Sequence, residues 1–240
     1  MTAVNVAENI ARVRERIGAA CHAAGRSASE VGLVAVSKRI DLDLVVAACA
    51  AGLWDLGENR VDEALRRQDE LPPLLEVAGL DPSLLRWHFI GHLQGNKAGK
   101  ASGRFTMMHG VHSLKLARRL SRLAEEAGRR EPVLLEVNIS RETQKSGVSC
   151  EDAPALIDEA AALPGLDLRG LMGMARFGAD ESELRATFAA LRDIAEKARP
   201  VAGLPLPELS MGMSGDFESA ILEGATLIRV GGAIFGPRTT

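Results

Sequence analysis

The run Val31-Gly-Leu-Val-Ala-Val-Ser37-Lys38-Arg39 is almost uniformly apolar up to Ser37 and then becomes basic. An unbroken Val/Leu/Ala run followed by a helical pattern is typical of a parallel strand buried on both faces. Lys38 then lies at the carboxyl end of the strand, where α/β folds place their chemistry. A lysine that is partly desolvated there has a lowered pKa and can form a Schiff base. The alternative is a solvated lysine that merely ends the strand.

Strand and helix patterns alternate along the rest of the chain. Seven further short apolar segments each precede a polar turn or a helical pattern, at 54–59, 85–90, 105–109, 132–138, 166–172, 207–211 and 226–230. This alternation predicts a parallel sheet, and eight units favour a closed (β/α)8 barrel over a doubly wound sheet. An additional N-terminal helix is predicted from apolar residues at helical spacing between Val6 and Cys21. Helices are expected to end before Pro72-Pro73 and before Pro200.

Composition limits the function classes. The 240 residues carry a formal net charge of −3, which gives no basic surface for nucleic acid or for an anionic membrane. No window is long and apolar enough for a transmembrane helix, and no signal-type apolar segment starts the chain. The three cysteines are far apart and odd in number, which is typical of a reducing cytoplasm. With no break in composition, residues 1–240 are expected to form one cytoplasmic domain.

Glycine-rich segments follow the last two predicted strands. They are Ser210-Met-Gly-Met-Ser-Gly-Asp216 and Arg229-Val-Gly-Gly-Ala-Ile-Phe-Gly236. Barrels often bind phosphate with these two loops, because glycine lets backbone N–H groups approach the anion and a serine hydroxyl adds a donor. A plain tight turn at Gly231-Gly232 is the alternative.

A lysine and a phosphate site at one barrel mouth suit a phosphorylated aldehyde, and pyridoxal 5′-phosphate (PLP) is the usual ligand of this kind. Arg229 can face the pyridine nitrogen, where it would weaken the electron sink because it cannot accept a proton from the ring; a salt-bridged strand residue is the alternative. No metal site is expected, since His88 and His92 span a strand end and have no cysteine or carboxylate cluster in sequence beside them.

The chain resembles the YggS/PROSC family of PLP homeostasis proteins in motifs that span nearly its whole length. These are Ala35-Val-Ser-Lys38, Gly57-Glu-Asn-Arg60, Trp87-His-Phe-Ile-Gly-His-Leu-Gln94 with Asn96-Lys97, Lys145-Ser-Gly147, Gly170-Leu-Met172, Ser210-Met-Gly-Met-Ser214 with Asp216-Phe-Glu218, and Arg229-Val-Gly231 with Ile234-Phe-Gly236. The resemblance implies an alanine-racemase-like barrel in which Lys38 carries PLP. The cofactor-binding residues that it implies are Lys38, Asn59, Met174, Ser210, Met211, Ser214, Gly215, Arg229, Gly231 and Gly232.

Two positions depart from the pattern of the family. Gly95 stands where the family often has serine, and Gly232 where it often has threonine or serine. The second change removes a possible hydroxyl donor to the phosphate, so PLP binding is expected to be modestly weaker.

The expected function is to bind, buffer and deliver PLP, with PLP-dependent apo-enzymes as transient partners, no substantial turnover and a monomeric state. A racemase or decarboxylase is the alternative, disfavoured because the sequence holds no tyrosine for a second base and ends soon after Gly236, without the β-domain of such enzymes. A Schiff-base aldolase acting on a sugar phosphate is more remote. The polar segment 140–147 is a candidate gate for cofactor exchange.

Overall fold

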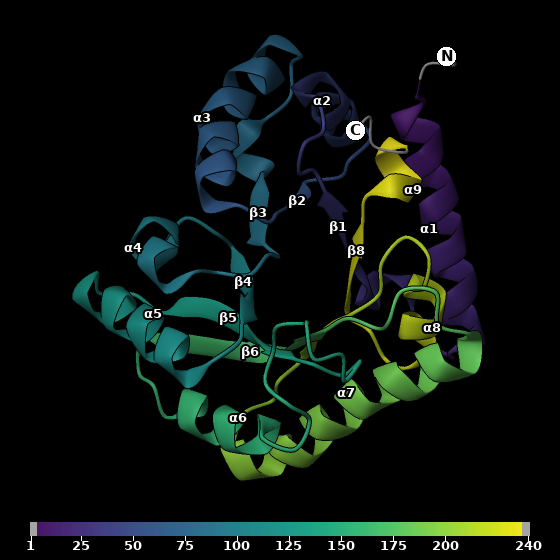
Figure 1. The fold of residues 1–240 in the computed structure, drawn as a ribbon. Helices are drawn as coiled ribbons and strands as arrows, with labels where there is room; N and C mark the ends of the chain where they lie inside the picture. The colour runs from purple at the N-terminus through teal and green to yellow at the C-terminus, as the bar shows by residue number, and fades with distance from the viewer. Residues whose placement is uncertain (1–3, 237–240) are drawn as a thin grey trace.

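Within residues 4–236, which the computed structural model describes, eight parallel strands close into a barrel in chain order (Figure 1). The predicted barrel is therefore confirmed. The strands are β1 (Gly32–Val36), β2 (Asp55–Glu58), β3 (Arg86–Phe89), β4 (Met107–Val111), β5 (Glu131–Val137), β6 (Leu166–Gly173), β7 (Glu208–Ser210) and β8 (Leu227–Val230). The ring closes where β1 pairs with β8, with Gly32 opposite Leu227.

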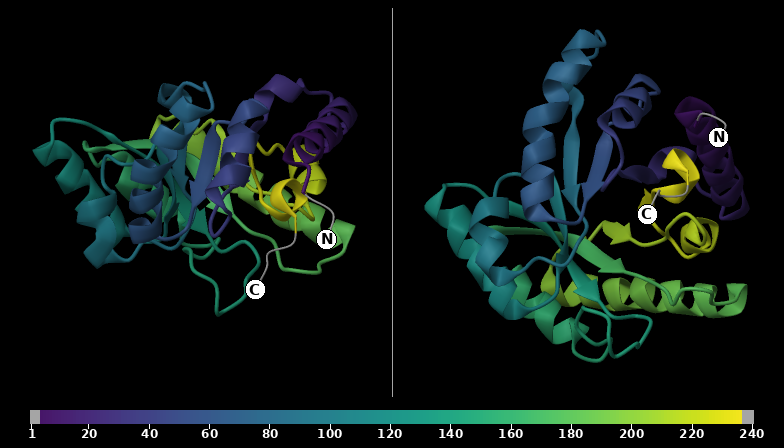
Figure 2. Two further views of the ribbon diagram at one scale, coloured as in Figure 1. Left: turned by 90° about the horizontal axis from the view of Figure 1, so that it is seen from above. Right: turned by 45° about the horizontal axis from the view of Figure 1, so that its top comes forward.

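The helices surround the strands, as the two views of Figure 2 show. They are α1 (Val6–Ala23), α2 (Leu42–Ala50), α3 (Val61–Val77), α4 (Ala98–Ala101), α5 (Leu114–Glu126), α6 (Ala153–Ala161), α7 (Glu181–Ala202), α8 (Phe217–Leu222) and α9 (Gly232–Phe235), with short 3-10 turns at Ala28–Glu30, Pro82–Leu84 and Gly95–Lys97. The additional helix α1 packs against α2, α8 and α9. Its predicted apolar stripe, including Ile10 and Ile17, is buried there.

Side chains alternate along the strands and so form two apolar cores. One small cluster lies inside the barrel and contains Met107, Leu134 and Met172. The larger cluster lies between the strands and the helices, where Phe89 and Leu135 are almost fully buried. This two-layer packing is what holds the strand ends, and hence the loops after them, in fixed positions. No helix among the described residues is both long enough and apolar enough to cross a membrane.

Three element boundaries differ from the prediction. Helix α3 continues through Pro72 and Pro73, and α7 continues through Pro200. A proline removes the bond to the carbonyl four residues earlier. Gln68 is partly exposed, and Asp69 and Glu196 are exposed, so water can solvate the freed carbonyls of these residues. Buried residues on the other face keep each helix on the barrel. Strand β4 lies two residues later than the predicted 105–109 segment.

Candidate functional site

Lys38 lies two residues beyond β1 and is held by a buried polar network beneath it. The hydroxyl of Ser37 donates a hydrogen bond of 2.7 Å to Oε1 of Glu58. Nε of Arg67 lies 3.1 Å from the same oxygen, and its Nη1 donates to the carbonyl of Ile40 across the loop that carries Lys38. Burial raises the pKa of Glu58, although Ser37, Arg67 and the charge of Lys38 oppose the shift. The network therefore fixes the backbone on both sides of Lys38.

A cavity of about 540 Å³ opens at the carboxyl ends of the strands, and Lys38 lines it. Seven of the ten residues expected to bind the cofactor meet there: Lys38, Met174, Ser214, Gly215, Arg229, Gly231 and Gly232. The loop after β6 contributes further lining residues that were not predicted, Arg176, Phe177, Gly178 and Ala179, and Phe177 is 96% exposed. That loop carries no sequence motif, so its place beside the cavity follows only from the three-dimensional arrangement of the barrel.

The loops after β7 and β8 form a cradle of hydrogen-bond donors on one side of this cavity. The Oγ atom of Ser214 accepts hydrogen bonds from the backbone N–H groups of Gly231 and Ala233, both at 3.3 Å. The accepted bonds orient the hydroxyl proton of Ser214 away from these amides. A Cβ atom at Gly232 would meet only Ser214 Oγ, at 4.0 Å, and one at Gly215 would meet nothing within 4 Å. The space beside these residues is open enough for an anion to approach the backbone.

Arg229 is buried and projects into the barrel, as predicted. Its Nη1 donates to Ser210 Oγ at 2.6 Å and its Nη2 donates to the carbonyl of Gly173 at 3.1 Å. Burial lowers the pKa of Arg229 to about 10, while the charges of Asp216 and Glu136 oppose the shift. The group thus remains charged at neutral pH. Its hydrogen bonds are to neutral oxygens, so the alternative of a salt-bridged strand residue is not what the geometry favours.

A chain of hydrogen bonds continues from Ser210 through the barrel interior. Ser210 Oγ lies 2.8 Å from Nδ1 of His109, Nε2 of His109 lies 3.0 Å from Nδ1 of His88, and Nε2 of His88 lies 2.9 Å from a carboxylate oxygen of Asp55. One assignment of protons satisfies every link, because each group donates toward Asp55 and both imidazoles are neutral. Burial is the main cause that lowers the pKa of His109 well below its usual value, and the nearby His88 and Arg229 act in the same direction, in keeping with a neutral ring. Ser210 therefore acts on Arg229 by holding it in place.

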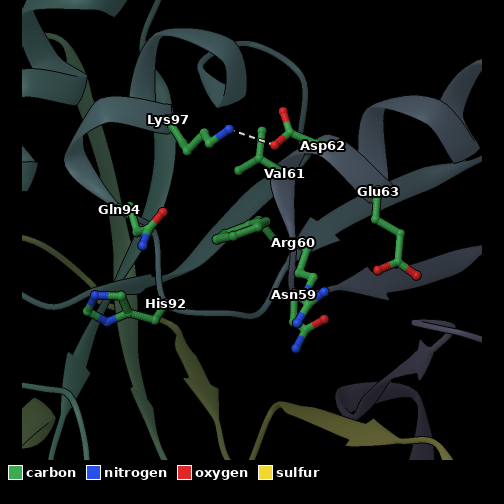
Figure 3. Close-up of a pocket in the computed structure, with 9 residues that line it drawn as sticks. Asn59, Arg60, Val61, Asp62, Glu63, His92, Gln94 and Lys97 are labelled. Atoms are coloured by element: carbon green, nitrogen blue, oxygen red, sulfur yellow. Dashed lines mark hydrogen bonds and ion pairs between the residues drawn. The ribbon is translucent and has the colours of Figure 1, made fainter.

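The remaining predicted residues lie elsewhere. Asn59 lines a neighbouring cavity of about 580 Å³ together with Arg60, His92 and Lys97 (Figure 3). Met211 is fully buried in the outer core, and Ser210 is fully buried beneath Arg229. The segment 140–147 lies against the end of β6, since Nζ of Lys145 donates to the carbonyl of Ala175 at 3.0 Å.

Comparison with known proteins agrees with this architecture. Residues 4–239 match the family described as alanine racemase, N-terminal domain. The chain is 45% identical, over 97% of its length and 96% of the relative's, to the pyridoxal phosphate homeostasis protein of Pseudomonas aeruginosa. It is 38% identical, over 98% of its length and 97% of the relative's, to the protein of the same name from Escherichia coli K12.

Solved structures give the same result. PipY of Synechococcus elongatus PCC7942 with PLP bound is 38% identical and superposes with a TM-score of 0.82, covering 97% of this chain and all of PipY (100%). An alanine racemase of Clostridium difficile 630, at 15% identity and a TM-score of 0.69 over 98% of this chain and 57% of the racemase, shares the fold alone. The chain belongs to the alanine racemase N-terminal domain family, and within it to the pyridoxal phosphate homeostasis proteins.

Proposed function

We propose that this protein binds PLP through a Schiff base on Lys38 and that it buffers and delivers the cofactor without substantial catalytic turnover. One observation carries the proposal: Lys38 and the cradle at Ser214 and Gly232 line the same cavity. The names of the relatives and the PLP-bound structure of PipY support the ligand. Three unpaired cysteines suit a reducing cytoplasm as the setting.

The residues present fit the chemistry of PLP. The phosphate would accept hydrogen bonds from the hydroxyl of Ser214 and from the backbone N–H of Gly232, beside the open faces of Gly215 and Gly232. The N–H groups of Gly231 and Ala233 donate to Ser214 Oγ and so hold that hydroxyl in place. Covalent attachment joins the Lys38 amine to the aldehyde carbon and releases one water molecule, so it needs no further reactant. Met174 and Ile90 supply apolar contacts in the same cavity.

Arg229 supports a carrier over a catalyst. Many PLP enzymes that stabilise a carbanion use a protonated ring nitrogen, which acts as an electron sink. A guanidinium has only N–H donors, and the pKa of Arg229, about 10, keeps it charged at neutral pH. An arginine facing the ring nitrogen therefore leaves that nitrogen unprotonated. The sequence also contains no tyrosine to serve as a second base.

The test of this function is transfer. PLP-loaded protein, freed of unbound cofactor, is mixed with a PLP-dependent apo-enzyme, and recovery of the apo-enzyme's activity is followed alongside racemisation of alanine and release of CO2 from amino acids. We expect recovery of the recipient, with the carrier acting as a monomer, and no enzyme-like turnover by the carrier itself. Rapid racemisation or decarboxylation by the purified protein would instead make it an enzyme.

Changing Gly232→Ser is expected to tighten PLP binding about two- to tenfold, the value of one added hydrogen bond. The position has room for a Cβ atom and does not have a positive φ, so serine fits without strain. Gly232→Ala is the matched control, because it adds the methyl group without the hydroxyl. Equilibrium binding of PLP measures the effect. Equal affinities in the two variants would show that the loop at residue 232 does not bind the phosphate.

A further inference from the structure

Three metal-ligating side chains converge at the barrel mouth from neighbouring strands. His92 follows β3, His112 directly follows β4, and Glu136 is near the end of β5. One ligand atom from each of these residues lies within 4.8 Å of the others. None of the three lines the cavity that contains Lys38, so this is a separate cluster.

Glu136 has one carboxylate oxygen to spare. Its side chain is buried, with 3% of the residue exposed. Oε1 accepts a hydrogen bond of 2.5 Å from the hydroxyl of Ser146, whereas Oε2 is buried without a hydrogen-bond partner among the described residues. The charge of Glu136 favours the charged form of Arg229, but the guanidinium donates its hydrogen bonds to Ser210 and to the carbonyl of Gly173. A buried carboxylate oxygen without a partner is costly, and a bound cation would remove that cost.

His112 is oriented as a ligand. Its Nδ1 lies 3.3 Å from the carbonyl of Gly110 and can only donate to it, which places the proton on Nδ1 and leaves the lone pair of Nε2 available. A backbone carbonyl in this role is a common way for proteins to fix the tautomer of a metal-bound histidine. The ring of His92 stacks on that of His112, with centroids 4.1 Å apart and planes inclined by 21°. Burial and the neighbouring His92 also lower the pKa of His112.

We propose that His92, His112 and Glu136 form a binding site for a divalent transition metal of the zinc class, with water in the remaining position. Two imidazoles and one carboxylate suit Zn²⁺ and Co²⁺, whereas Ca²⁺ and Mg²⁺ prefer all-oxygen sites. Ligand distances of about 2.0–2.2 Å require the cluster to contract. His92 is exposed, so neighbouring side chains do not enclose its ring.

The histidine pair of this cluster, His92 and His112, is not the pair His88 and His92 that lies four residues apart in the sequence. His88 is taken up inside the barrel by Asp55 and His109, so it is not available to His92. The partner of His92 is His112, which directly follows the next strand. The three ligands lie at or just beyond the carboxyl ends of β3, β4 and β5, so a bound metal would cross-link three adjacent strand ends. Its binding to the folded state alone would raise the melting temperature.

The test uses untagged, full-length protein treated with a chelator and then dialysed. Zn²⁺ is titrated by calorimetry, and Co²⁺ is followed by its visible absorption. We expect one equivalent of either metal to bind and Zn²⁺ to raise the melting temperature. His112→Ala and Glu136→Gln should each weaken binding by at least about 100-fold and abolish the thermal shift. Ser146→Ala, which removes only the support of Glu136, should weaken binding about tenfold.

His22→Ala is the matched control, because His22 is an exposed histidine on α1, far from the cluster in sequence. It should bind metal like the unaltered protein. PLP binding is measured on every variant as a check of the fold, so failure of the metal site and failure of the proposed PLP function are distinguished. Weak or absent binding by the unaltered protein, or unchanged binding by His112→Ala, would overturn the proposal.

Discussion

In the Lys38→Ala variant we expect the absorbance band of the PLP Schiff base to be lost completely. The amine at residue 38 is the group proposed to bond the aldehyde, and Lys38 shares its cavity with Ser214 and Gly232. An alanine there leaves the phosphate cradle intact but supplies no nucleophile. The protein should then hold PLP only by non-covalent contacts, which gel filtration removes. Absorbance spectra taken before and after borohydride reduction, with mass mapping of the reduced adduct, measure the loss.

Lys97→Ala provides the control for this experiment. Lys97 lines the neighbouring cavity, and its Nζ donates to Asp62 at 2.6 Å (Figure 3). Its removal should leave the band and the phosphopyridoxyl mass on Lys38 unchanged. An adduct that persists in Lys38→Ala would contradict the assignment of Lys38 as the Schiff-base lysine. An adduct that maps to Lys97 would place the cofactor in the neighbouring cavity. A protein that stays colourless with PLP would favour a cofactor-free Schiff-base reaction.

The fold was largely predictable, because burial on both faces leaves a clear pattern in the sequence. The runs Leu33–Val36 and Val133–Leu135 are apolar without a break, as buried parallel strands require. Helix ends were harder. A proline signals a break, but Pro72 and Pro200 lie on partly or fully exposed faces, where water can replace the lost bond and tertiary packing maintains the helix. Propensity alone cannot weigh that packing.

The candidate site was predictable where glycine and serine mark a loop, as at Ser214 and Gly231. It was less predictable where the alternation of side chains along a strand decides which residues face the barrel interior. Ser210 faces the barrel interior beneath Arg229, so its neighbour Met211 must face outward, and it is buried against the helices. The contacts of His109 and of Glu136 join strands that are distant along the chain. Their distances follow from barrel closure and could not be obtained from spacing.

The second large effect is expected for Arg67→Met, which should lower the free energy of unfolding by about 3–5 kcal/mol, the usual loss when one partner of a buried ion pair is removed. Arg67 and Glu58 are 5% and 0% exposed. Methionine matches the stem of arginine but removes the positive charge beside the carboxylate of Glu58, which keeps its hydrogen bond from the hydroxyl of Ser37. Urea unfolding followed by fluorescence of Trp54 and Trp87 measures the change.

The double variant Arg67→Met/Glu58→Gln separates charge from packing. Glutamine keeps an acceptor for Ser37 and carries no charge, so most of the lost stability should return. The pH dependence gives an independent check. The pKa of Glu58 is already raised by burial, and without Arg67 it rises further, so the folded variant is penalised only while that carboxyl is ionised. The deficit of Arg67→Met should therefore shrink as the pH is lowered from 8 toward 5, while the double variant shows no such trend. If the loss of unfolding free energy in Arg67→Met does not change with pH, Arg67 stabilises the fold through packing and through its hydrogen bond to the carbonyl of Ile40, not through the charge of Glu58. The position of Lys38 would then be set by the backbone of its loop.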